Sequence, residues 1–325
     1  MKPLTSLIAV VVSASLAGIA SGGDTAPPAS MGDISAPRDV TIGEPCADGP
    51  LGSQKIAFVS DRDGDFEIYS VLADGTGLER LTHHPGKDED PAWSPDGQRI
   101  AFVSDRSGSR AIYVMNADGS DVVRWTFSSS YWNEGPSWSP DGTQIAYATL
   151  SGNGSMNLWV MTLDAEGRRP ALLFGAPGWD AQPAWSPDGT RLALASDWVA
   201  YDFVSDIYLI NADGSGFTPL TGDMFDFTDY YSPAWSPSGE KLAATIIRRV
   251  GPEDVATLGV MNSDGSGLTS LISSVAWTTS SWSPDGQRIA FTSGSGGSRD
   301  LSWVNADGSA TGSIISNGWN PSWRR

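Results

Sequence analysis

The amino-acid sequence predicts an all-β protein, a six-bladed β-propeller of four-stranded blades. The first observation is a block, Pro-Ala-Trp-Ser-Pro-Asp-Gly at 91–97, which returns with small changes four more times. Its tryptophans, spaced by 45 to 50 residues, are Trp93, Trp138, Trp185, Trp235 and Trp282. A period of roughly 40–50 residues is typical of one propeller blade. The other two observations are the strand-like segments between the blocks and the complementary ends of the repeat region.

The segments between the blocks have the pattern of antiparallel strands. Each Ser-Pro-Asp-Gly run predicts a tight turn, and an alternating segment such as 99–103 or 144–147 follows it. A second strand is expected in each of six repeats, at 68–71, 112–115, 158–161, 207–210, 258–261 and 301–304. Five of these run into Asp-Gly turns, at Asp74, Asp118, Asp213, Asp264 and Asp307, before a short outer strand. We interpret the repeated aspartates as turn formers and the repeated tryptophans as wedges between blades.

The two ends of the repeat region predict that the ring closes. Pro321-Ser322-Trp323 reproduces the start of the block at the end of the sequence. Residues 55–60 begin in mid-repeat, without the strand that leads every other repeat. We therefore expect the C-terminal strand to pair into the first blade, which closes a ring of six and removes an exposed sheet edge.

The residues ahead of the repeats have a different composition. Residues 1–22 have a positive start, a short apolar run and small residues after it, which predicts a secretory signal peptide. Residues 23–52 are rich in Pro, Gly, Ala and Asp and are interpreted as a flexible lead-in that contains Cys46, a free thiol. The propeller is then expected over 53–325. The mature protein should be periplasmic or secreted, with no membrane insertion after signal cleavage.

Charge and composition exclude several classes of function. The chain has 20 Lys and Arg against 38 Asp and Glu, a net charge of −18, which argues against nucleic acid and anionic membranes as partners. A single cysteine excludes an intramolecular disulfide and any cysteine-based zinc site. The two histidines are adjacent, and neither a nucleophile elbow, a zinc-protease motif nor a phosphate-binding loop is present. We therefore expect a protein that is not an enzyme.

The Trp-Ser-Pro-Asp-Gly blocks, followed by strands such as Ile100-Ala101-Phe102-Val103, resemble the propeller repeats of the TolB-like family, also called PD40 or WD40-like repeats. The resemblance covers about residues 53–325. It implies an exported propeller that binds a protein or peptide partner, and a central channel that can hold calcium. Similar repeats precede the hydrolase domain of prolyl-oligopeptidase relatives and occur in some oligogalacturonate lyases.

The candidate binding residues lie just ahead of each Trp-Ser block, where the chain crosses from one blade to the next. Such crossings lie near the central channel, and loops on a rigid ring are common places for function. Five of the six crossings carry an aromatic residue four to seven positions before the repeat tryptophan. The predicted partner-binding residues are His83, His84, Trp132, Glu134, Trp179, Asp180, Tyr230, Tyr231, Trp277, Trp319 and Asn320. In the alternative interpretation, these aromatics cover neighbouring blades and the carboxylates are only solvated.

Three carboxylates in the crossings raise the question of a metal ion. If Asp90, Glu134 and Asp180 converge on a narrow channel, a bound Ca²⁺ would relieve their mutual repulsion with oxygen ligands. A hydrated acidic rim without metal is the competing interpretation.

Taken together, the sequence favours an exported binding or scaffold propeller that docks a protein or peptide on the face around the channel. Two alternatives stay open. One is a carbohydrate-directed propeller, which binds polysaccharide or retains a degenerate lyase site. The other is the propeller remnant of a prolyl-oligopeptidase-type protease.

Overall fold

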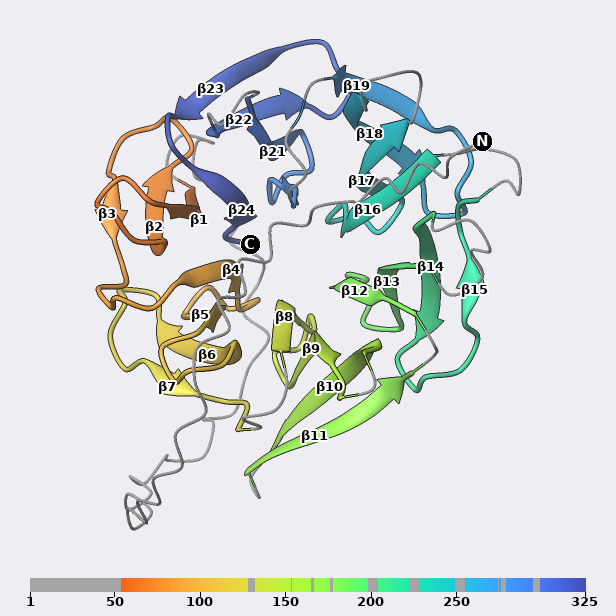
Figure 1. Ribbon diagram of the computed structural model, residues 1–325. Helices are drawn as coiled ribbons and strands as arrows, with labels where there is room; N and C mark the ends of the chain where they lie inside the picture. Colours follow the sequence, from red (N-terminus) through yellow and green to blue (C-terminus); the bar gives the residue numbers. More distant parts are fainter. Residues whose placement is uncertain are drawn as a thin grey trace, which may run out of the picture. The chain divides into compact units, whose positions relative to one another are not determined.

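The structure, a computed structural model, describes residues 54–127, 132–152, 154–164, 167–175, 178–197, 204–222, 228–248, 255–273, 275, 279–294 and 299–325. These residues form 24 β-strands in six antiparallel sheets of four strands each (Figure 1). The predicted all-β, six-bladed fold is confirmed. The signal peptide at 1–22 and the lead-in at 23–52, with Cys46, lie outside the described residues.

The four strands of each blade follow one another from the channel to the rim. Blade 1 holds β24 (Trp319–Trp323), β1 (Lys55–Ser60), β2 (Glu67–Leu72) and β3 (Glu79–Arg80); blade 2 holds β4 (Asp88–Trp93), β5 (Arg99–Ser104), β6 (Ala111–Asn116) and β7 (Val123–Arg124). Blade 3 holds β8 (Trp132–Trp138), β9 (Gln144–Leu150), β10 (Met156–Asp164) and β11 (Gly167–Phe174); blade 4 holds β12 (Asp180–Trp185), β13 (Arg191–Ser196), β14 (Asp206–Asn211) and β15 (Thr218–Pro219). Blade 5 holds β16 (Thr228–Trp235), β17 (Lys241–Arg248), β18 (Val255–Asn262) and β19 (Thr269–Ser273); blade 6 holds β20 (Ser281–Trp282), β21 (Arg288–Ser293), β22 (Asp300–Asn305) and β23 (Thr311–Ile315).

Blade 1 is built from both ends of the described chain. The C-terminal strand β24 pairs antiparallel with β1, with Ile56 opposite Trp323 and Val59 opposite Trp319. The six inner strands contact one another in sequence around the ring, and β24 contacts both β20 and β4 (Figure 1). The predicted closure by the C-terminal strand is therefore confirmed.

The middle strands of each blade are buried on both faces because the blades pack against each other. In β5, Ile100, Ala101, Phe102 and Val103 are all buried, although successive side chains point to opposite faces of the sheet. This double burial explains why these strands are almost continuously apolar instead of strictly alternating. It also holds the inner strands in a fixed ring, and these strands carry the residues that differ from blade to blade.

The repeated Asp-Gly aspartates form turns, as predicted. Asp74 accepts hydrogen bonds at Oδ1 from the backbone N–H of Thr76 at 2.9 Å and from its hydroxyl at 2.7 Å. The same backbone contact recurs in blades 2, 4, 5 and 6, at Asp118, Asp213, Asp264 and Asp307. Hydrogen bonds to the carboxylate lower the pKa of each of these five aspartates. These carboxylates therefore stabilise the turns by accepting hydrogen bonds within them.

One hydrogen bond at the repeat tryptophans joins each pair of neighbouring blades, and the residue just before the tryptophan selects its form. Where that residue is alanine, its carbonyl accepts from the indole Nε1 of the next blade's tryptophan: Trp138 to Ala92 (3.2 Å), Trp235 to Ala184 (3.1 Å) and Trp282 to Ala234 (3.0 Å). Where it is serine, its Oγ accepts from the backbone N–H of the next tryptophan: Trp93 to Ser322 (3.2 Å), Trp185 to Ser137 (3.3 Å) and Trp323 to Ser281 (2.8 Å). All six interfaces of the ring carry one form or the other.

A bulge interrupts five of the six inner strands three residues before the repeat tryptophan, and β20 begins only after the corresponding residue. We call this position the bulge residue; its occupants are Asp90, Gly135, Gln182, Ser232, Thr279 and Asn320. Five of the six have a left-handed backbone, with φ between 51° and 59°, and the exception is Thr279. A bulge with this conformation redirects the side chain, and it costs about 1–3 kcal/mol at a residue other than glycine.

Candidate functional site

A central channel of about 370 Å³ runs between the six inner strands. All six bulge residues line it, as do all six repeat tryptophans. The bulge residues lie near the start of each inner strand, on the side where the chain crosses between blades. We call that side the crossing face, and the bulge residues form the mouth of the channel there.

One side of this mouth is charged. The charged half consists of Asp90, Arg110 and Glu134, which line the channel, together with Glu89 next to Asp90; they come from β4, the β5–β6 hairpin and β8. Arg110 forms ion pairs with Glu89 and with Asp90, whose Oδ2 lies 3.6 Å from the guanidinium. Asp90 also accepts a hydrogen bond from Nδ2 of Asn320 at 2.8 Å, which links blades 1 and 2. Three carboxylates therefore surround one guanidinium.

This crowding changes the proton affinities of the charged half. Burial and the nearby charge of Asp90 raise the pKa of Glu134 to about 7, while Arg110 and a hydrogen bond from the Trp132 side chain oppose the rise. Burial also raises the pKa of Glu89. Burial would lower the pKa of Arg110, but the charges of Asp90, Glu89 and Glu134 raise it overall. Arg110 therefore keeps its positive charge, whereas Glu134, with a pKa of about 7, changes its charge near neutral pH.

The opposite side of the mouth is neutral. The neutral half consists of the bulge residues Gln182, Ser232 and Thr279, with Ser280 beside them in the channel lining. Gln182 Oε1 accepts a hydrogen bond from the backbone N–H of Ser232 at 2.8 Å, which links blades 4 and 5. The hydroxyls of Ser232 and Ser280 are buried and have no hydrogen-bond partner among the described residues.

The aromatic residues of the crossings separate into two groups. Trp132 and Trp179 are 37% and 45% exposed, and both stand six residues before the repeat tryptophan of their blade. The ring centroid of Trp132 lies 4.8 Å from the Arg110 guanidinium. The exposed pair therefore stands on the crossing face in adjacent blades 3 and 4.

The aromatics closer to the repeat tryptophan lie in the core. Trp319 is buried and packs edge-to-face on Phe66, with ring centroids 5.1 Å apart. Tyr230 is buried and Tyr231 half-buried, and both pack between blades. For these three residues the structure favours the packing interpretation over partner binding. Trp277 lies outside the described residues.

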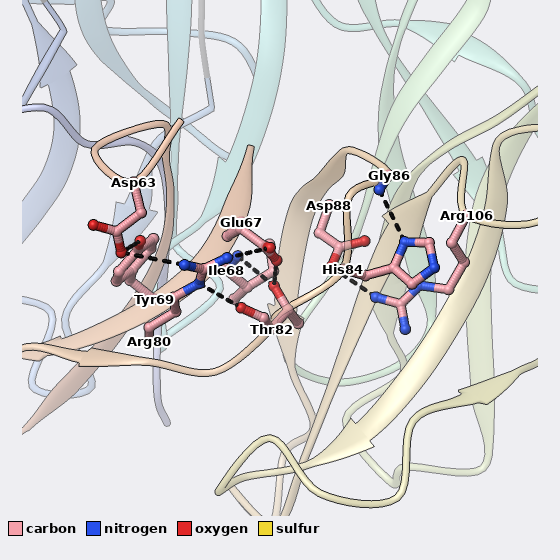
Figure 2. Close-up of polar contacts among 10 residues, drawn as sticks. All are labelled: Asp63, Glu67, Ile68, Tyr69, Arg80, Thr82, His84, Gly86, Asp88 and Arg106. Atoms are coloured by element: carbon pink, nitrogen blue, oxygen red, sulfur yellow. Dashed lines mark hydrogen bonds and ion pairs between the residues drawn. The ribbon is translucent and has the colours of Figure 1, made fainter. Parts of the chain in front are cut away.

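The two histidines stand apart from the channel lining. His83 is exposed. His84 is half-buried, and its Nδ1 accepts a hydrogen bond from the backbone N–H of Gly86 at 2.9 Å (Figure 2). One imidazole nitrogen thus holds the local turn.

A buried acid with an arginine partner lies in the blade on each side of the crossing that carries the histidines (Figure 2). Asp88 Oδ2 lies 2.7 Å from the Arg106 guanidinium, and burial raises the pKa of Asp88 to about 6 against the effect of that cation. In blade 1, Glu67 pairs with Arg80 at 2.6 Å and accepts a hydrogen bond from the Thr82 hydroxyl at 2.5 Å. These contacts fix the chain within each blade on either side of the crossing.

The three carboxylates proposed as calcium ligands do not converge. Asp180 is fully buried inside blade 4, where its Oδ1 accepts a hydrogen bond from the Ser196 hydroxyl at 2.6 Å. It is absent from the channel lining, whereas Asp90 and Glu134 are present. The physical reason is that Asp180 lies opposite Ser196 in the sheet register, so its side chain satisfies that neighbour. Across the described residues, no group of three or more His, Cys, Asp or Glu is placed to hold a metal ion.

Sequence reasoning missed Arg110. It follows the Ser-Gly-Ser turn of a hairpin and carries no motif, so only the fold brings it to the carboxylates of two crossings. The sequence carries no signal for this contact, because the burial of Arg110 among carboxylates appears only in the fold.

Comparison with known proteins agrees with this architecture. Residues 49–147 match the family model described as the TolB beta propeller domain, PD40. The chain has a TolB-like propeller fold.

Solved structures extend the TolB-like match over most of the chain. TolB from Acinetobacter baumannii is 21% identical with a TM-score of 0.70, over 85% of this chain and 67% of that one. A putative TolB from Agrobacterium tumefaciens is 20% identical with a TM-score of 0.56, over 69% and 90% of the two chains. An oligogalacturonate lyase in complex with manganese is 15% identical with a TM-score of 0.58, over 81% and 74%. At these identities the likeness concerns the fold.

No stretch of helix in the described part of this TolB-like propeller has the length and apolar character needed to cross a membrane.

Proposed function

We propose that this TolB-like propeller is an exported binding or scaffold module without catalysis of its own. It docks a protein or peptide partner on the crossing face, around the mouth of the central channel. The rigid ring positions the docking residues, and the crossings supply their variety.

The observation that carries this proposal is the exposure of Trp132 and Trp179. Among the described residues, the crossings of blades 5 and 1 bury Tyr230 and Trp319, yet these two tryptophans are 37% and 45% exposed on adjacent blades of one face. A large, rigid aromatic with a hydrogen-bonding tip is the side chain most often found at the energetic centre of protein interfaces. Exposed tryptophans on the crossing face therefore favour recognition over packing.

A binding experiment with single variants tests the proposal. Immobilised full-length protein is exposed to envelope extract, and the captured proteins are compared for wild type, Trp132→Ala and Trp179→Ala. We expect both variants to lose the same protein. Leu78→Ala is the matched control, because Leu78 is exposed next to an Asp-Gly turn instead of a crossing. Capture that survives both tryptophan changes contradicts the proposed docking face.

The carbohydrate alternative uses the same two residues, since exposed tryptophans also stack on sugars. Titration with oligogalacturonate, followed by tryptophan fluorescence, separates the two proposals. A fluorescence change in wild type that disappears in Trp132→Ala and Trp179→Ala would favour a sugar ligand. The protease-remnant alternative expects no specific ligand on this face, so capture that depends on the tryptophans contradicts it.

A further inference from the structure

The charged half of the channel mouth carries more negative than positive charge. Glu89, Asp90 and Glu134 surround a single cation, Arg110, which forms its ion pairs with the first two. Within the described residues, no basic nitrogen lies within 4.0 Å of the Glu134 carboxylate. Glu134 and Asp90 both line the channel. The mouth therefore presents one carboxylate, that of Glu134, which has no ion-pair partner among the described residues.

A second, independent observation comes from the neutral half. Ser232 and Ser280 are only 4% and 8% exposed, and both line the same channel. Neither hydroxyl has a hydrogen-bond partner among the described residues. A buried hydroxyl without a partner costs about 1–3 kcal/mol, which favours a bound group that supplies one.

We propose that the channel mouth binds a primary ammonium group, which Glu134 and Asp90 recognise while Ser232 and Ser280 bind the polar group joined to it. A peptide amide near a lysine side chain has this chemistry, with an ammonium at one end and hydrogen-bonding groups at the other. This inference rests on the proposed function, because the ammonium belongs to the docking partner.

The groups that face Glu134 predict how pH acts on binding. Asp90 and Glu89 from β4 repel its negative charge, and Arg110 and the Trp132 side chain support it. Because Glu134 must be ionised to bind the cation, its pKa near 7 places the change between pH 6 and pH 8. Binding of a cation favours the ionised form, so the complex releases a proton near pH 7.

Calorimetry with defined probes tests the inference on the full-length protein. The probes are lysine capped as N-acetyl methylamide, the equally capped norleucine, and cadaverine. We expect capped lysine to bind, with affinity about tenfold higher at pH 8 than at pH 6. Capped norleucine should not bind, and cadaverine, a free amine without amide groups, should bind at least about fivefold more weakly. Equal binding of norleucine overturns the ammonium subsite, and equal binding of cadaverine overturns the peptide partner.

Variants locate the subsite. Glu134→Gln should weaken capped lysine about tenfold at pH 8 and remove the pH dependence. Ser280→Ala should weaken it about threefold. Glu240→Gln is the matched control, because Glu240 is exposed in a Ser-Pro-Ser-Gly turn away from the channel lining, and it should bind as wild type does. Equal effects of Glu134→Gln and Glu240→Gln overturn the assignment.

The outcome is distinguishable from a failure of the proposed function. If partner capture depends on Trp132 and Trp179 but capped lysine does not bind, only the ammonium subsite is contradicted. If capped lysine binds but partner capture is unchanged in Trp132→Ala and Trp179→Ala, the docking face is contradicted.

Discussion

In blades 2 and 3 the mouth of the channel holds Asp90 at the bulge position, with Arg110 and Glu134 beside it, whereas the bulge positions of blades 4 and 5 hold Gln182 and Ser232. The backbone is left-handed in both halves, and an inter-blade hydrogen bond crosses each of them. The difference between them is charge. The bulge residues Asp90, Gln182 and Ser232 teach that the bulge fixes where a side chain stands in the channel, while the residue type decides what that side chain can bind.

The change with the largest expected effect removes the cation from the charged half. Arg110→Ala leaves three carboxylates without a cation between them and should destabilise the fold by about 3 kcal/mol at pH 8. The loss should be smaller at pH 5, where Glu134, with a pKa near 7, is protonated. Urea unfolding at both pH values measures the difference. The matched change in the neutral half, Gln182→Ala, should cost about 1 kcal/mol at either pH, and equal losses would refute the comparison.

Replacement of Glu134 should raise the stability of the fold, in contrast to the loss expected on removal of Arg110. Burial raises the pKa of Glu134 from 4.5 to about 7, so its ionised form is disfavoured in the fold relative to the unfolded chain. Stability from this group is therefore complete below about pH 4.5 and is lost as the pH rises to about 7. Glu134→Gln should match wild type at pH 4 and exceed its stability by about 3 kcal/mol at pH 8. Parallel pH profiles of the two proteins would show that this pKa is not raised.

Loss of the hydrogen bond that links the charged half to blade 1 should reduce stability by an intermediate amount. Asn320→Ala removes the hydrogen bond to the Asp90 carboxylate and should cost about 2 kcal/mol, since the acceptor is charged. Asn320→Gly removes the same bond but tolerates the φ of 51°, so it should be about 1 kcal/mol less harmful. Thermal unfolding of both variants separates the two contributions. A glycine variant no more stable than the alanine variant would exclude backbone strain at this bulge.

Addition of calcium should change the stability of the protein least. Only Asp90 and Glu134 of the proposed ligands line the channel, whereas Ca²⁺ prefers six to eight oxygen ligands. We therefore expect 5 mM Ca²⁺ to raise the melting temperature by less than about 2 °C, and Glu134→Gln to abolish even that shift. A rise above about 5 °C that survives Glu134→Gln would place a calcium site elsewhere.

The sequence predicted the fold well because turns and period are local signals. The Trp-Ser-Pro-Asp-Gly blocks locate both ends of each inner hairpin, and the two incomplete ends could belong only to one blade. The repeat also indicates the packing role of Asp180. Asp180 and Asn133 stand at the same position of their blades, and each forms a side-chain hydrogen bond with the residue opposite it on the next strand, Ser196 and Thr149.

Other features of the site could not be read from local patterns. A residue before proline is expected to be extended, yet Asp90, Gln182, Ser232 and Asn320 all precede a proline and are left-handed. The exposed Trp132 and the buried Trp319 differ only by two positions relative to their repeat tryptophans. Tertiary contacts decide both outcomes, as they decide the partners of Arg110.

The occurrence of either serine or alanine before the repeat tryptophans bears on how such a protein can evolve. Every tryptophan offers both a backbone N–H and an indole N–H, so either neighbour finds a donor. A gene segment that encodes one blade can therefore be duplicated or exchanged without compensating changes in the next. Mutation is then free to diversify one crossing at a time while the joints between units stay compatible.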